Sequence, residues 1–94
     1  MQFKTSLSHP LQIAVIAAPR GGQIGVTFCP GKHQTAAMSG AWRRDLATDV
    51  RAIQEWGATI VITLLEAHEF QTLDVPDLGH ACKAAGLAWL HLPI

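Results

Sequence analysis

The apolar positions of residues 42–56 repeat with the period of an α-helix. The apolar stripe consists of Leu46, Val50, Ile53 and Trp56, and the charged residues Arg43, Arg44, Asp49, Arg51 and Glu55 lie off it. Spacings of four, three and three residues place the stripe on one helical face. Gly57 follows as a stop signal, because glycine readily adopts the left-handed conformation that ends helices. We predict a helix over Trp42–Trp56.

Two short apolar runs near the amino terminus indicate a β-hairpin. Leu11–Ala18 is rich in β-branched residues, and Gln23–Cys29 alternates in part between apolar and polar positions. Pro19–Gly22 between them has the composition of a turn. The glycines of Gly21–Gly25 open a strand, whereas those of a dinucleotide-binding loop open a helix. The pattern therefore favours a hairpin turn over a phosphate-binding loop.

Two further apolar runs flank a second helix. Ala58–Leu65 is unbroken and β-branched, which is typical of a central strand buried on both faces of a sheet. Pro76–Ala85 begins with a proline and is followed by Gly86, as helices often are. Leu87–Ile94 is the last apolar strand. A helix between two strands predicts a parallel βαβ unit.

The remaining segments are predicted connections. Lys32–Ala41 is small and polar without a period, and Glu66–Asp74 is a polar link with room for one helical turn. The predicted fold is therefore α/β, in the order β-β-α-β-α-β, with a polar lead-in over residues 1–10 and one domain over residues 11–94. No helix follows the last strand to cover the second sheet face, so we expect residues 11–94 to be part of a larger α/β domain.

Composition narrows the class of protein. The 94 residues carry seven basic and seven acidic side chains, so no general positive charge attracts nucleic acid or anionic lipid. Hydrophobic residues make up 49%, which excludes disorder, and only 15% are charged, against about 25% in typical domains. No apolar stretch approaches the roughly 18 residues of a membrane span. We expect a cytoplasmic protein that binds neither nucleic acid nor membranes.

Metal-binding and redox motifs are not evident. The histidines are His9, His33, His68, His80 and His91, and the cysteines are Cys29 and Cys82. The sequence has no Cys-x-x-Cys or His-x-x-x-His pair of the kind that zinc sites usually contain. We predict neither a metal site nor a cofactor.

The loop after the predicted central strand holds the candidate site. Glu66, His68 and Glu69 follow the carboxyl end of that strand, where open α/β sheets place their ligand crevices. The alternative interpretation is an ordinary solvated loop. Ser39 and the threonines have no neighbouring histidine or aspartate that the predicted fold would bring within hydrogen-bond reach, so no catalytic nucleophile is indicated.

Several strings together resemble a known family. They are Gly25–Lys32, Trp42–Leu46, Trp56–Ala58, Val61–Glu66, Val75–Pro76, Ala85–Leu87 and His91–Ile94. As a set they resemble the amino-terminal half of cysteine-dependent dual-specificity and tyrosine phosphatases, in particular the cyclin-dependent-kinase-inhibitor-3-like, or kinase-associated phosphatase-like, group. The resemblance implies a partial three-layer sheet of the phosphatase type and places Glu66, with His68 and Glu69, at the rim of an active-site cleft.

The resemblance also implies a reaction for which this chain lacks the signature. Such phosphatases use a His-Cys-x-x-Gly-x-x-Arg loop, in which a thiolate of low pKa attacks phosphorus while backbone amides and the arginine hold the phosphoryl oxygens. Neither Cys29 nor Cys82 is followed by an arginine at the required spacing. The general-acid aspartate is expected after Ile94. We predict no catalytic residue within the chain and no activity of the chain alone.

Three functions remain open. The first is half of a phosphatase, which would act on a phosphoprotein or a small phosphoester once a carboxyl-terminal half completes it. The second is a noncatalytic α/β interaction module that forms a homo-oligomer or pairs with a partner chain through its uncovered sheet. The third is a small-ligand module that uses the loop Glu66–Glu69.

Overall fold

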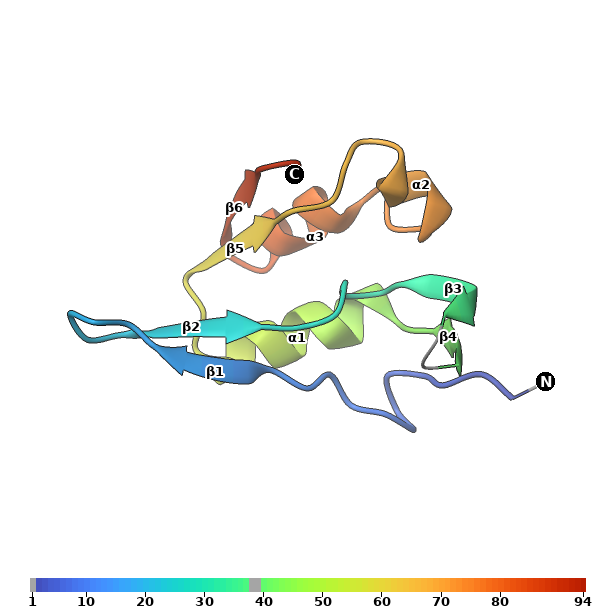
Figure 1. Cartoon of the computed structure of the whole chain (residues 1–94), viewed down its shortest axis with the longest axis horizontal. Coiled ribbons are helices and arrows are strands. Elements are labelled where there is room, and N and C mark those ends of the chain that lie inside the picture. Colours follow the sequence, from blue (N-terminus) through green and yellow to red (C-terminus); the bar gives the residue numbers. More distant parts are fainter. Residues whose placement is uncertain (1, 38–39) are drawn as a thin grey trace.

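The computed structural model describes residues 2–37 and 40–94 as an α/β fold (Figure 1). The strands are β1 (Ala14–Ala17), β2 (Gln23–Val26), β3 (His33–Ala37), β4 (Gly40–Arg43), β5 (Ile60–Thr63) and β6 (Ala88–His91). The helices are α1 (Leu46–Trp56), α2 (Glu69–Thr72) and α3 (Leu78–Ala84). The strands pair as two antiparallel hairpins, β1–β2 and β3–β4, and one parallel pair, β5–β6.

The first hairpin confirms the sequence prediction. β1 pairs antiparallel with β2, and Ile16 lies opposite Ile24. Gly21 and Gly22 have φ angles of 88° and 80°, which a residue with a β-carbon adopts only at a cost. The glycine cluster is therefore a hairpin turn, and the hairpin projects beyond the end of α1 (Figure 1).

The second hairpin corrects the prediction of a loop over Lys32–Ala41. β3 and β4 pair antiparallel, with Gln34 opposite Trp42 and a register shift before Ala37. Trp42 was also predicted to begin the helix, but it belongs to β4 and is only 5% exposed. The pattern missed this hairpin because most residues before Trp42 are small or polar, which gives no alternation.

Helix α1 begins four residues later than predicted. Asp45 has an extended backbone, and its side chain accepts a hydrogen bond from the Thr48 backbone N–H at 2.8 Å. This bond satisfies one of the amides that the first turn leaves free and fixes the start of the helix. At the other end Gly57 adopts φ 103°, as its position after the apolar stripe predicts.

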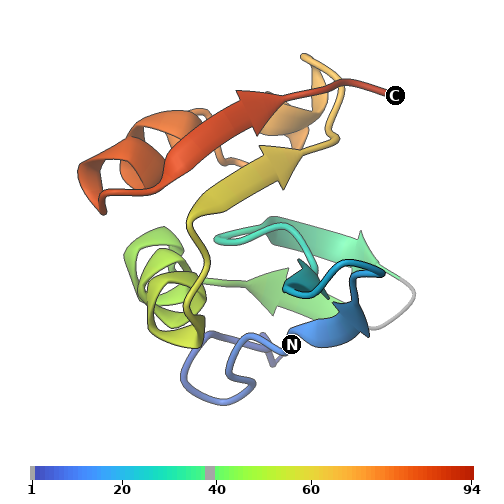
Figure 2. The same ribbon diagram turned by 90° about the vertical axis from the view of Figure 1, so that its left-hand side faces the viewer.

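The parallel pair and the two longer helices enclose the core. β5 and β6 align Ile60 with Ala88 and Thr63 with His91, as the βαβ pattern predicts, and α3 packs against β6 (Figure 2). The buried core consists of Val50, Ile53, Val75, Leu78, Cys82 and Leu87. These side chains come from α1, from α3 and from the segments that flank α3, so the crossover helix and α1 share one core.

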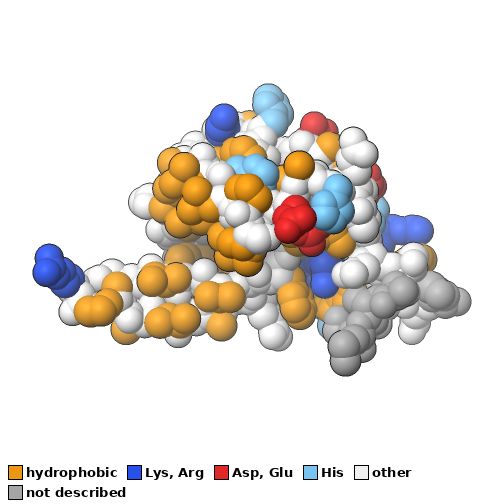
Figure 3. Space-filling view, turned by 45° about the horizontal axis from the view of Figure 1, so that its top comes forward, with side chains coloured by type: hydrophobic (Ala, Val, Ile, Leu, Met, Phe, Trp, Pro, Cys, Tyr) orange, Lys and Arg blue, Asp and Glu red, His pale blue; other side chains and the backbone are white. Residues whose placement is uncertain are grey.

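The second face of the parallel pair is uncovered, which makes the prediction of a strand buried on both faces wrong for β5. Alternate residues of both strands point the same way and are largely exposed: Ile60, Ile62 and Leu64, with Leu90, Leu92 and Ile94. Their exposed fractions lie between 44% and 82%. Figure 3 shows hydrophobic side chains gathered on this side of the molecule, over β5–β6 and along the β1–β2 hairpin. Within this structure β5 is thus a strand with one packed face.

The amino-terminal segment packs on the second hairpin. Lys4 donates from its backbone N–H to the Ala41 carbonyl at 2.8 Å, and the Arg43 N–H donates to the Lys4 carbonyl at 2.9 Å. Ser6 is 5% exposed. No helix in the described part of the chain is long and apolar enough to cross a membrane.

Candidate functional site

The parallel strands bring their carboxyl ends to one edge of the molecule. The Leu92 N–H donates to the Thr63 carbonyl at 2.9 Å, and the Ile94 N–H donates to the Leu64 carbonyl at 3.4 Å, so the pairing continues past the strands. The His91 ring is hydrogen-bonded through Nε2 to the Leu65 carbonyl. This edge is where ligand crevices form in open α/β sheets, and it leads directly into the loop singled out in the sequence.

The structure brings Glu66, His68 and Glu69 together in that loop. A Glu69 carboxylate oxygen accepts a hydrogen bond from the Glu66 backbone N–H at 2.8 Å, and His68 Nδ1 lies 3.6 Å from a Glu66 carboxylate oxygen. The His68 and Glu66 side chains are 73% and 53% exposed. Two carboxylates beside one histidine do not by themselves form a phosphate-binding site, because each carboxylate repels a phosphate group. A role at a cleft rim therefore stays a prediction for these three residues.

An aromatic cluster behind the loop is a feature that the sequence analysis missed. The Trp89 and His91 rings stack with their centroids 5.8 Å apart and their planes at 12°. Phe70, on α2, meets the His91 ring edge-on at 5.0 Å and the Trp89 ring at 6.4 Å. Trp89 Nε1 donates to Thr63 Oγ1 at 2.9 Å, which fixes its ring. The spacing of two residues between Trp89 and His91 was the available signal, because it places both rings on one face of a strand.

Cys29 lies in the turn that leads into β3 and has no features of a nucleophile. Burial raises the pKa of its thiol to about 11, against a smaller opposing effect of the Lys32 ammonium. The Lys32 nitrogen lies 4.2 Å from the centre of the Phe28 ring, and burial lowers its pKa. A reactive cysteine needs the reverse, a polarised and partly exposed site that lowers its pKa. Cys29 therefore remains a protonated thiol at neutral pH.

Cys82 is equally unsuited to nucleophilic chemistry. It belongs to α3, its side chain is fully buried in the core, and burial raises its pKa. A small buried thiol of this kind acts as a hydrophobic residue. Neither described thiol therefore has the environment of an activated cysteine, and the absence of a nucleophile from the chain stays a prediction.

A buried polar network supports the turn that carries Cys29. Arg44 and Asp49 are 4% and 1% exposed, although the sequence pattern placed both off the apolar stripe. The Asp49 carboxylate accepts a hydrogen bond from the Ser6 hydroxyl at 2.8 Å and another from the Gly31 backbone N–H at 2.8 Å. The carboxylate thereby ties the amino-terminal segment, the turn before β3 and the first turn of α1 together. Among the described residues no group of three potential metal ligands occurs.

Comparisons with known proteins show what the fold of this chain is similar to. No family model and no curated protein matches the sequence. The structure matches a crystal structure of kinase-associated phosphatase, in which the catalytic-site cysteine is replaced by serine, with a TM-score of 0.78 and 20% sequence identity. The match covers 90% of this chain but only 47% of that chain, its amino-terminal portion. The chain therefore has the fold of about the first half of a kinase-associated phosphatase.

Proposed function

We propose that this chain is the amino-terminal half of a cysteine-dependent phosphomonoesterase unit and that its nucleophile comes from a segment outside the 94 residues. The observation that carries the proposal is the match to 47% of a phosphatase chain whose catalytic-site cysteine was replaced by serine in the matched crystal structure. The uncovered face of β5–β6 supports it, because Ile62, Leu90 and their neighbours are exposed where a complete domain would bury them. The substrate is a phosphoprotein or a small phosphoester.

The division of roles follows from the chemistry. A thiolate of the second half attacks phosphorus, the bond from phosphorus to the leaving oxygen breaks, and an acid of the second half protonates that oxygen. Water then hydrolyses the cysteinyl phosphate to inorganic phosphate and restores the thiol. The present chain supplies the parallel strands and, at their carboxyl ends, the loop with Glu66, His68 and Glu69, which we propose borders the cleft.

A fusion protein tests the proposal. Residues 1–94 are joined to the part of kinase-associated phosphatase that the match does not cover, and turnover of para-nitrophenyl phosphate is measured. We expect turnover that inorganic phosphate inhibits. The matched control carries serine in place of the catalytic cysteine and should be inactive. A fusion that unfolds cooperatively but releases no nitrophenol would contradict the proposal.

A second candidate function is a noncatalytic module that associates through its uncovered sheet. The exposed side chains of Ile62 and Leu90 favour it, because large exposed apolar patches often mark interfaces. Sedimentation of the isolated chain, together with the fusion assay, distinguishes the two candidates. The interaction module is favoured if the chain forms a stable oligomer that Ile62→Glu dissociates and if the fusion protein is inactive. A monomer with an active fusion favours the phosphatase half.

A further inference from the structure

The outer edge of β6 is open in the described part of the chain. β6 pairs with β5 alone, and it uses the backbone N–H groups of Ala88 and, just beyond the strand, Leu92 for that pairing. Since successive residues of a strand direct their N–H and C=O groups to opposite sides, those of Trp89 and His91 face the outer edge.

Protection against further pairing is confined to the carboxyl end of this edge. Natural edge strands carry lysine, glutamate, proline or a bulge that blocks a further strand. Pro93 follows the strand, whereas Ala88–His91 contains none of these features and its register with β5 is regular over all four residues. The edge is thus available to a short extended segment over these four residues.

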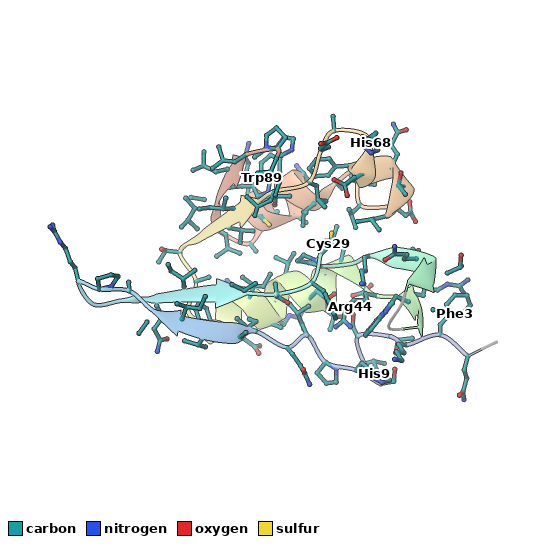
Figure 4. All side chains as sticks on the ribbon, viewed as in Figure 1. Phe3, His9, Cys29, Arg44, His68 and Trp89 are labelled. Carbon is teal, nitrogen blue, oxygen red and sulfur yellow. The ribbon has the colours of Figure 1, made fainter. Side chains whose placement is uncertain are left out.

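A groove lies beside Trp89, between β6 and α3. It has a volume of about 320 Å³ and is lined by Phe70, Pro76, Gly79, His80, Lys83 and Trp89. Its floor is aromatic, and the Lys83 nitrogen lies 5.8 Å from the centre of the Trp89 ring. The hydrogen bond from Trp89 to Thr63 and the contact with Phe70 hold the indole in place. Figure 4 labels Trp89 among the side chains.

The charges around the groove select its occupant. Lys83 and His80 are exposed on α3, and no carboxylate lines the groove. A second copy of this chain could pair through its own β6, but Leu87–Ile94 contains no acidic residue to place beside Lys83. Charge complementarity therefore favours a foreign segment with a carboxylate.

We infer that β6 binds an extended acidic peptide segment, which adds a strand to the outer edge at Trp89 and His91 and places a carboxylate beside Lys83. Strand addition supplies the affinity through backbone hydrogen bonds, and the groove supplies the preference for one side chain. The inference concerns a docking site for a partner polypeptide and does not depend on the proposed phosphatase role.

Amide NMR of the 94-residue chain tests the site. The probe is a blocked hexapeptide, Thr-Val-Glu-Val-Thr-Val, and the matched control replaces its glutamate with lysine. We expect the amide signals of Trp89 and His91 to shift and their hydrogen exchange to slow. The lysine peptide should bind about two- to fivefold more weakly, the range for an exposed ion pair. Methylation of alternate peptide nitrogens should abolish binding by either peptide.

Two variants of exposed cations check the charge preference. Lys83→Glu should make the lysine peptide bind more tightly than the glutamate peptide. Arg51→Glu, on the exposed side of α1, should leave the order of the two affinities unchanged. No amide change at millimolar peptide, or equal binding of both peptides, would overturn the inference. Concentration-dependent shifts of the same amides without peptide would also overturn it, because they would make a second copy the occupant.

Discussion

Arg44 and Asp49 form a buried, two-point ion pair that joins the end of β4 to the first turn of α1. Arg44 Nε donates to Asp49 Oδ2 at 2.7 Å, and Arg44 Nη2 donates to Oδ1 at 3.1 Å. Because Ser6 and Gly31 donate to the same carboxylate, every charge and lone pair of the pair has a partner. Such a pair stabilises only as a unit, since either charge alone is costly to bury.

The first prediction is that Asp49→Ala strongly destabilises the chain. The substitution leaves the Arg44 guanidinium buried without a counter-charge and removes the acceptor of Ser6 and Gly31, at a cost of about 3–5 kcal/mol in the free energy of unfolding. Urea denaturation followed by circular dichroism measures it. Glu55→Ala, on the exposed side of the same helix, is the control and should change stability by at most about 0.5 kcal/mol. Equal effects of the two substitutions would rule out a special role of the pair.

The second prediction concerns the start of α1. Asp45→Ala removes the cap and should cost about 1 kcal/mol, whereas Asp45→Asn keeps a side-chain acceptor and should cost less. Hydrogen bonds from the Thr48 hydroxyl and backbone lower the pKa of the Asp45 carboxyl below its ordinary value of 3.8. Its contribution is therefore complete above pH 4 and lost as the pH falls through the folded-state pKa. Denaturation of wild type and Asp45→Asn from pH 5 to 2 should show a difference that shrinks with acid; a constant difference would refute the assignment.

The third prediction is alkaline destabilisation through Cys29. Its pKa is raised from 9.0 to about 11 in the folded chain, so between these values the unfolded chain has lost a proton that the folded chain retains. The contribution of the protonated Cys29 thiol to the free energy of unfolding is thus fully present below pH 9, and it is lost as the pH rises toward 11. The difference in unfolding temperature between wild type and Cys29→Ala should be smaller at pH 10 than at pH 7. Alkylation of Cys29 by iodoacetamide should also be slower than that of free glutathione, and a faster reaction would contradict the raised pKa.

The fourth prediction concerns the contact between α3 and β6. A β-carbon at Gly79 would lie 2.7 Å from two carbons of the Trp89 ring, so Gly79→Ala forces the indole or the helix to move. We expect a cost of about 1–3 kcal/mol, despite the better helix propensity of alanine. A double-mutant cycle with Trp89→Leu should recover most of that cost. If the effects of the two substitutions on the free energy of unfolding simply add, then the Trp89 indole is not what the new β-carbon at position 79 collides with.

The sequence predicted the elements whose apolar pattern is regular. The stripe of α1, the turn at Gly21 and Gly22 and the parallel βαβ unit all follow from spacing or from backbone preference. The β3–β4 hairpin could not be predicted in this way, because backbone pairing with Lys4 and the buried side chain of Trp42 stabilise it. The prediction that β5 is buried on both faces was wrong for a related reason. An apolar run shows that a strand can be buried on both faces, but it does not show which part of the polypeptide covers each face.

The candidate site was predictable in place but not in content. Position after a strand predicted that Glu66, His68 and Glu69 follow the edge where the carboxyl ends of the parallel strands meet, and that they border a cleft stays a prediction. The aromatic cluster depends on α2 folding back to bring Phe70 against Trp89 and His91, a tertiary contact without a local signal. The burial of Asp49 was hidden in the same way, because its partners Ser6 and Gly31 are distant in sequence.

In the proposed function, the 94 residues form half of a phosphatase unit and have no nucleophile of their own. The most direct measurement is turnover of para-nitrophenyl phosphate by the isolated chain, with Cys29→Ser and Cys82→Ser variants assayed beside it. We expect no turnover above the buffer blank in any of the three proteins. Phosphate-inhibited turnover by the isolated chain that either serine substitution abolishes would contradict it.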